Sequence, residues 1–336
     1  MNVNFSGKLT QAINLQMPFV LFRKPNEEMI QLIVNDNSEE NIFLIHSFDN
    51  ETEKSISDKN PIQIHQDEFN FEFKLNLESG ENFNPISEEN YVELIQKTID
   101  EIQTSETNKI VISRIKQIDN QCFNLFRSFK NLLETHPGAL VYMWHNPGNE
   151  TWIAATPELL LSKNENIVKT VSLAGTKLSE TGWTSKEFNE QQIVTDYILE
   201  NFSEMNEVEL KGPETIQAGK FQHLKSYISG KIHSEFSLED LLEKMHPTPA
   251  VCGLPKEKAF EFIVENEGYD RNFYAGYIGI ETESSQEYFV NLRCAQFYQN
   301  KIWIYVGGGI TAESNPQNEW NETELKSGTI LNSLLK

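Results

Sequence analysis

The stretch FVNLRCAQFYQNKIWIYVGGGITAESNPQNEWNETELK, residues 289–326, carries the strongest structural signal in the chain. Together with the preceding residues from Tyr274, its apolar and aromatic runs predict three antiparallel strands that lead to the glycines Gly307–Gly309. A helix is predicted to follow over residues 316–335. We expect Arg293 to lie buried inside one of these strands, where its guanidinium needs either a structural carboxylate or a substrate carboxylate as partner.

The rest of the chain mixes strands and helices without strict alternation. Four strands with polar turns between them are predicted in residues 17–75, in the segments PFVLF, MIQLIV, NIFLIHSF and FNFEFKLNL. Further strands begin at KIVISR and PELLL, and a hairpin is expected around NPGNE. Helices are predicted over 86–104, 184–205 and 255–266, in LFRSFKNLLETHPG, and after Phe236. This pattern predicts an α+β fold of packed, mainly antiparallel sheets with outer helices, in one domain over residues 1–336.

Composition narrows the class of protein. A formal charge of −22 disfavours nucleic acid and anionic membrane surfaces as partners. The chain has 3 cysteines and no CxxC, so we expect neither a disulfide framework nor a zinc site, and a reducing, cytoplasmic location. The first residues show no secretory signal, and the apolar runs are too short to span a bilayer.

Two pairs of glutamates each have the three-residue spacing that places both members on one helix face: Glu187 with Glu190, and Glu319 with Glu322. Four carboxylates around one point would repel each other unless a hard cation such as Mg²⁺ joined them, and Mg²⁺ prefers oxygen ligands. Either pair alone is better explained as a solvated helix face. Glu322 and Lys326 also have the spacing of an ordinary salt bridge.

Three further features could carry chemistry. Lys109 opens the KIVISR strand and is a candidate base if burial or positive neighbours lower its pKa. Glu158 begins an apolar run, where burial would raise its pKa and keep it protonated as an acid. The glycines Gly307–Gly309 permit close approach to the backbone and free its N–H donors. Each feature alone has a simpler structural explanation, and His223 and His246 lack metal-ligand spacing.

In the residues of these segments and in their order along the chain, the sequence resembles the chorismate-utilising enzymes, and most closely the isochorismate synthases. The matching segments cover roughly residues 105–335, whereas residues 1–100 match weakly. They are KIVISR, ATPELLL, SLAGT, EFNE, QHL, HPTPAVCGLP, YDRNFYAGYIG, VNLRCA, YVGGGI and EWNETELK. The resemblance implies a single α+β domain with two packed sheets, a Mg²⁺ ion, and chorismate as the small-molecule partner.

It also implies roles for individual residues. Lys109 would activate a water that attacks C2 of chorismate, and Glu158 would protonate the departing C4 hydroxyl. Metal binding falls to four glutamates, with Glu190 and Glu322 in direct contact and Glu187 and Glu319 acting through waters. The implied substrate-binding residues are Gly175, Thr176, His223, Ala250, Tyr274, Leu292, Arg293, Gly307, Gly309 and Lys326.

The assignment to a subfamily depends on fewer residues. Lys109 stands where ammonia-using anthranilate synthases have glutamine, and Ala174 stands where aminodeoxychorismate synthases have the lysine of a PIKGT segment. Both residues favour water as nucleophile. Ala250 favours stopping at isochorismate, although salicylate synthase, an ammonia-using relative and a catalytically silent chorismate binder stay open. Gln191 departs from the histidine common in relatives. A monomer is expected, and either menaquinone or siderophore biosynthesis could use the product.

Overall fold

The structure is a computed structural model that describes residues 4–80, 83–120, 123–178, 182–218 and 221–334. The chain forms two compact units that interleave along the sequence. Unit 1 contains residues 1–158, 247–279 and 290–336, and unit 2 contains residues 159–246 and 280–289. The α+β class and the antiparallel character of the sheets confirm the sequence prediction. No helix in these described ranges is both long and apolar enough to cross a membrane.

Unit 1 is built on a nine-stranded sheet in the order β13-β6-β17-β16-β8-β7-β1-β2-β5, and each neighbouring pair is antiparallel. The predicted KIVISR strand is β6, and the strand that ends in the triple glycine is β17 beside it. The bounds are β1 (Phe19–Arg23), β2 (Met29–Val34), β5 (Ile62–His65), β6 (Lys109–Asp119), β7 (Leu140–Asn146), β8 (Glu150–Thr156), β13 (Gly253–Leu254), β16 (Cys294–Phe297) and β17 (Lys301–Ile310).

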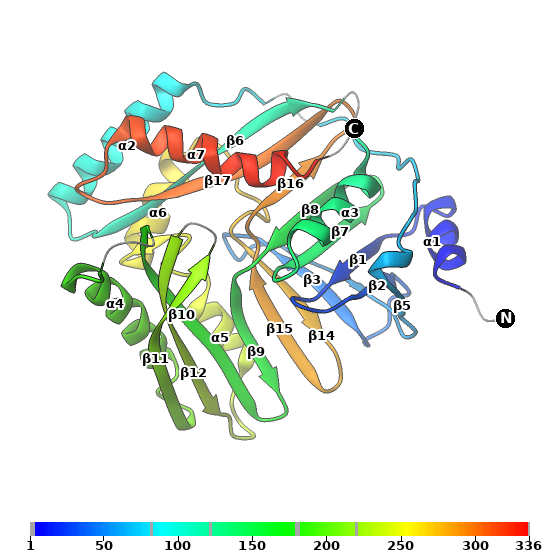
Figure 1. Cartoon of the computed structure of the whole chain (residues 1–336), viewed down its shortest axis with the longest axis horizontal. Helices are drawn as coiled ribbons and strands as arrows, with labels where there is room; N and C mark the ends of the chain where they lie inside the picture. Colours follow the sequence, from blue (N-terminus) through cyan, green and yellow to red (C-terminus); the bar gives the residue numbers. More distant parts are fainter. Residues whose placement is uncertain (1–3, 81–82, 121–122, 179–181, 219–220, 335–336) are drawn as a thin grey trace. The chain divides into compact units, whose positions relative to one another are not determined.

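Among its described residues, unit 1 contains the α-helices α1 (Phe5–Asn14), α2 (Glu88–Thr104), α3 (Leu125–Thr135), α6 (Lys256–Asn266) and α7 (Pro316–Leu331). Helices α1 and α3 bury apolar side chains in a cluster with the sheet, including Leu9, Phe126 and Phe129. Helix α7 lies along β17 and against α2, as Figure 1 shows, and α6 contacts β6. The strand that begins with Lys109 is therefore flanked by helices of the same unit.

Three strands of the second sheet lie in unit 1: β14 (Tyr277–Glu281), β3 (Ile42–His46) and β4 (Glu53–Ser57). The last two residues of β14 fall beyond the unit boundary, which follows residue 279. Phe43 of β3 packs against aromatic rings of the nine-stranded sheet, with ring centroids 5.1 Å from Phe22 and 5.6 Å from Tyr142. Sheet-on-sheet packing is thus present within this unit.

Unit 2 holds the remaining strands of that sheet in the order β11-β12-β10-β9-β15, all antiparallel. They are β9 (Leu159–Asn164), β10 (Ile167–Leu178), β11 (Asn206–Ala218), β12 (Phe221–Lys231) and β15 (Ser285–Val290), the last of which extends one residue past the boundary. Helix α4 (Ser185–Asn201) covers β10 and β12 (Figure 1), and α5 (Leu238–Met245) contacts α4.

Some predicted elements differ from the structure. The run FNFEFKLNL is not a strand; its alternating side chains, from Phe69 to Leu77, instead pack against the core cluster of unit 1. Strands β4, β5, β11 and β12 and helix α1 were not predicted. The region after Tyr274 contains four strands rather than three, because the chain turns between β15 and β16.

Candidate active site

Lys109 lies at the start of β6, between two strands that present glycines to it. On one side, Gly253 of β13 has φ 141°, and an added Cβ there would lie 2.2 Å from the carbonyl oxygen of Lys109. On the other side, an added Cβ at Gly309 of β17 would lie 2.6 Å from Lys109 Cε and 3.3 Å from Nζ. The lysine side chain therefore occupies space that exists only because Gly309 lacks a side chain.

Glu158 follows β8 and is hydrogen-bonded through its backbone to the segment that carries Arg293. Its carbonyl oxygen accepts from Val290 N at 2.9 Å, and Ala155 N donates to the carbonyl oxygen of Arg293 at 3.1 Å. Thr156 Oγ1 also donates to the carbonyl oxygen of Val290. These bonds hold the end of β8 beside residues 290–293.

Burial raises the pKa of Glu158, although the positive charges of Lys109 and Arg293 both oppose the shift. Although the side chain of Arg293 is partly exposed, desolvation by the surrounding protein lowers the pKa of its guanidinium, and the charge of Glu158 partly offsets this shift. These three groups therefore interact electrostatically within unit 1. The net direction favours a protonated Glu158, which is the state a general acid needs.

The prediction that Arg293 lies buried inside a strand is wrong. Arg293 lies between β15 and β16, is exposed, and has φ 47° in the left-handed region. The flanking apolar residues suggested a continuous strand, but the backbone turns here so that both Val290 and Arg293 bond to the end of β8. The turn leaves the guanidinium accessible to an anionic ligand.

The triple glycine is approached by a different functional side chain at each position. Lys326 Nζ donates to the carbonyl oxygen of Gly307 at 3.0 Å. An added Cβ at Gly308 would lie 3.1 Å from Glu319 Oε2, and Gly309 accommodates Lys109 as described above. A bare stretch of backbone is thus lined by two amines and a carboxylate from β6 and α7.

The acidic residues of α7 are close enough to influence each other. Burial raises the pKa of Glu319, and the negative charge of Glu322 raises it further. A hydrogen bond from Ser314 and the positive charge of Lys326 lower that pKa but do not cancel the shift. Lys326 Nζ lies 2.6 Å from Glu322 Oε1, so the ordinary salt bridge predicted from the spacing is present.

The other predicted residues of unit 1 lie around the same segments. Tyr274 is buried, stacks on Tyr305 with centroids 5.4 Å apart, and its hydroxyl oxygen would lie 3.0 Å from an added Cβ at Gly307. Leu292 is half-buried in the turn beside Arg293. Ala250 is exposed, three residues before Gly253.

Five predicted residues belong to unit 2. Gly175 lies at a register shift of β10, and Thr176 pairs with His223 of β12; the side chain of Thr176 lies outside what the structure describes. Glu190 is exposed on α4. Glu187 Oε2 accepts from Thr184 N at 2.8 Å and from its Oγ1 at 2.5 Å, so it also takes part in capping the start of α4.

Next to Glu190, the side chain of Gln191 is buried among hydroxyl groups. Its Nε2 lies 2.7 Å from Ser172 Oγ and 3.2 Å from Ser226 Oγ, and Thr195 Oγ1 lies 2.7 Å from Ser172 Oγ. These contacts tie α4 to β10 and β12. Gln191, which departs from the usual histidine, is thus part of a polar cluster beneath the helix.

Comparison with known proteins identifies the family. A sequence model of the family described as chorismate binding enzyme matches residues 11–335. The chain belongs to this family. The isochorismate synthase MenF of Haemophilus influenzae is 26% identical over 259 residues, which are 73% of this chain and 60% of that protein. The isochorismate synthase EntC of Escherichia coli is 29% identical over 247 residues, 68% of this chain and 63% of that protein.

The fold of this family member also matches a solved structure. The menaquinone-specific isochorismate synthase MenF of Escherichia coli superposes with a TM-score of 0.82 at 18% identity, covering 95% of this chain and 89% of that one. The matched regions span less than two thirds of the two sequence relatives.

The family implies a magnesium ion, and the donor chemistry of the glutamates fits one. Glu319 is a partly buried carboxylate whose pKa is raised by burial and then by the charge of Glu322, and a hard divalent cation would stabilise both groups in ionised form. Among residues that the structure describes, no group of three His, Cys, Asp or Glu side chains could hold a metal. The pairs on α4 and α7 belong to different units, so a shared ion stays a prediction.

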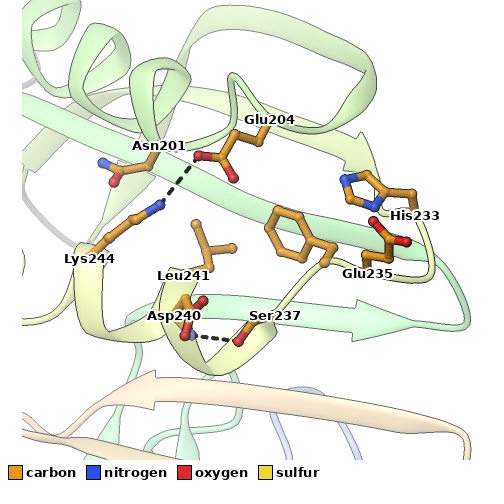
Figure 2. Close-up of a pocket in the computed structure, with 9 residues that line it drawn as sticks. Asn201, Glu204, His233, Glu235, Ser237, Asp240, Leu241 and Lys244 are labelled. Carbon is orange, nitrogen blue, oxygen red and sulfur yellow. Dashed lines mark hydrogen bonds and ion pairs between the residues drawn. The ribbon is translucent and has the colours of Figure 1, made fainter.

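A pocket in unit 2 contains none of the predicted site residues. It lies between the end of α4, the end of β12 and α5 (Figure 2), and Lys244 forms an ion pair with Glu204 at 3.5 Å across it. Its polar lining and its small volume of about 100 Å³ do not suit the ring of a chorismate-like ligand.

Sequence reasoning missed Gly253 and the buried residues that support β6. Ser113 N donates to Glu267 Oε1 at 2.6 Å, and Arg271 Nη2 donates to the carbonyl oxygen of Val111 at 2.7 Å. Gly253 stands within the HPTPAVCGLP segment, so its motif was visible, but only strand pairing reveals its contact with Lys109.

Proposed function

We propose that this protein is an isochorismate synthase, a Mg²⁺-dependent isomerase that converts chorismate to isochorismate. The observation that best supports the proposal is the electrostatic coupling of Glu158 with Arg293 and with Lys109, whose side chain lies against Gly309. An amine and a carboxyl that favours its protonated form are the base and acid that addition of water and loss of hydroxide require. Membership of the chorismate-binding family, and relatives that are isochorismate synthases, support the same assignment.

In this mechanism, the amine of Lys109 takes a proton from water while the water oxygen forms a bond to C2 of chorismate. The ring double bonds shift, the C4–O bond breaks, and Glu158 donates its proton so that the hydroxyl leaves as water. Lys109 then returns its proton to solvent, and Glu158 takes one up. Burial shifts the pKa of Glu158 upward, which is the direction that a proton donor requires.

The substrate is a dicarboxylate, and several groups would bind its two charges. Arg293 is exposed in a turn beside Glu158 and offers a planar pair of donors. Lys326 and the backbone of Gly307 and Gly309 would receive carboxylate oxygens. In unit 2, the residues Gly175, Thr176 and His223 would contact the ring.

Four glutamates would hold the metal: Glu190, Glu322, Glu187 and Glu319. A Mg²⁺ ion there would bind and orient the ring carboxylate and neutralise its charge. Ala250, Tyr274 and Leu292 would lie near the substrate. The proposal requires no partner other than chorismate, and it takes the protein to be a cytoplasmic monomer.

The test is incubation of the purified protein with chorismate, with and without Mg²⁺ and ammonium, followed by chromatography of the products. Isochorismate formed with Mg²⁺ and without ammonium is expected. Salicylate and pyruvate would instead indicate a salicylate synthase, and a product that appears only with ammonium would indicate an aminating enzyme. Chorismate binding without turnover in Mg²⁺ would overturn the enzymatic proposal.

A further inference from the structure

Arg114 is a buried cation on β6 whose side chain donates hydrogen bonds to α7, and its guanidinium carbon also lies 5.7 Å from the ring centroid of Tyr91 on α2. Its side chain is 3% exposed. Nε donates to Thr323 Oγ1 at 2.8 Å and Nη2 donates to Glu324 Oε1 at 2.5 Å. The guanidinium carbon also lies 3.9 Å from the ring centroid of Trp320, a cation–π distance. One residue therefore contacts α7 in three chemically different ways.

A second cation on the same strand strengthens this attachment. Lys116 Nζ lies 2.6 Å from the other carboxylate oxygen of Glu324 and 3.3 Å from Ser327 Oγ. Each carboxylate oxygen of Glu324 is therefore paired with a different cation of β6.

The anchored residues form a stripe beside the functional stripe of the same helix. Trp320, Thr323 and Ser327 are spaced by three and four residues, so they share one face. Glu319, Glu322 and Lys326 follow the same spacing on the adjacent face. Because successive residues of a helix are separated by about 100°, a rotation that breaks the first stripe also displaces the second.

We propose that Arg114 is a positioning residue that fixes the rotation of α7, and so places Glu319, Glu322 and Lys326 for metal and substrate. This inference rests on the proposed function. Lysine cannot replace arginine here, because an ammonium cannot reach Thr323 and Glu324 together while it lies flat against an indole ring.

The experiment measures Mg²⁺ binding by titration calorimetry without chorismate, and turnover as a function of Mg²⁺ concentration. Arg114→Lys and Glu324→Gln are each expected to raise the Mg²⁺ dissociation constant about tenfold, while turnover at saturating Mg²⁺ changes less than about threefold. A purely structural role would lower the amount of active protein without this split between binding and turnover.

Arg127→Lys is the matched control, since Arg127 pairs with Glu72 at 2.7 Å but both side chains are about half exposed. It is expected to titrate like the wild type. If Arg114→Lys does not fold by circular dichroism, Glu324→Gln carries the test. Folded variants that bind Mg²⁺ as the wild type does would overturn the inference alone. A wild type that neither binds Mg²⁺ nor converts chorismate would overturn the proposed function and this inference with it.

Discussion

The two residues assigned to proton transfer hold contrasting places in unit 1. Lys109 begins β6 beside a strand end, and its side chain runs over Gly309. Glu158 follows β8 in a partly buried position where its carboxyl favours the neutral form. Sequence alone identified both as candidates, but either could have been an ordinary surface residue. Their electrostatic coupling, together with that of Arg293, is what the structure adds.

Lys109→Ala is expected to lower chorismate turnover by about 10³-fold, because removal of a general base typically costs 10²–10⁴-fold. The fold should remain, since the lysine side chain is only partly buried. Product formation and circular dichroism check the two statements. Lys258→Ala is the control, since Lys258 is an exposed lysine paired with Glu106 at 2.8 Å. A Lys109→Ala enzyme within a few-fold of wild-type turnover would remove Lys109 from its role.

Glu158 gives a prediction about stability and pH. A carboxyl whose pKa is raised in the folded state from its ordinary value of 4.5 stabilises the fold fully below pH 4.5, and this contribution is lost as pH rises through the folded-state pKa. Glu158→Gln cannot ionise, so its free energy of unfolding should decline less over that interval than that of the wild type. Urea unfolding at a series of pH values measures the difference. Parallel curves for the two proteins would contradict the assigned direction of the shift.

At the scale of elements, the packing of the Lys109 side chain of β6 against β17 depends on the absence of a side chain at Gly309. Gly309→Ala is expected to displace the Lys109 amine and lower turnover by about 10²-fold, because small misplacement of a catalytic group can cost that much. Gly138→Ala is the control, since its added Cβ would approach only Asn26 Oδ1, at 3.8 Å. Steady-state kinetics and thermal unfolding of both variants make the comparison. Unchanged turnover in Gly309→Ala would show that Lys109 has room to move.

The attachment of α4 gives a second prediction at this scale. Gln191→Leu removes the donor shared by Ser172 and Ser226 and leaves buried hydroxyls without it, so we expect a loss of about 1–3 kcal/mol in the free energy of unfolding. Gln192→Leu changes an exposed neighbour that bonds Asp196 at 2.7 Å, and should change stability by less than about 0.5 kcal/mol. Urea denaturation measures both. Equal stabilities would mean that the hydroxyl cluster re-pairs without Gln191.

Elements were predictable where local signals agreed with tertiary contacts. Helices α2 and α5 lie where they were predicted, and Ser87 and Ser237 cap them, each accepting a hydrogen bond from the backbone three residues on. The alternation in Phe69–Leu77 predicted a strand, yet alternating side chains can pack against a core without a paired neighbour. Residues 206–218 pair as β11 although their mixed polar composition gave no clear strand pattern.

At the scale of the whole molecule, the chain passes between the two units four times, after residues 158, 246, 279 and 289. Neither unit is one continuous segment, so neither can unfold without constraining the ends of the other. We therefore expect a single cooperative transition in urea. Trp183 is the one tryptophan in the sequence of unit 2, and the other four belong to unit 1. Urea unfolding followed by tryptophan fluorescence should give the same midpoint for the wild type and for Trp183→Phe. Different midpoints for the two proteins would show that the units unfold independently.

The residues proposed for the site are divided between the units in the same way, eleven in unit 1 and five in unit 2. Sequence order alone grouped them through resemblance to a family, which the family match from residue 11 to 335 supports. Spacing could not assign them to units, because two of the four boundaries, after residues 279 and 289, fall inside strands β14 and β15. The single-domain prediction and the shared metal site stay predictions.

Strand β15 has a consequence for synthesis on the ribosome. It pairs with β9 from Ser285 with Asn164 to Phe289 with Leu159, although more than a hundred residues separate the two strands in the sequence. During translation, one edge of β9 therefore stays unpaired until β15 has been synthesised and has left the exit tunnel. In that interval the exposed edges of β9 in nascent chains on neighbouring ribosomes could associate, and binding by a chaperone would be most useful then.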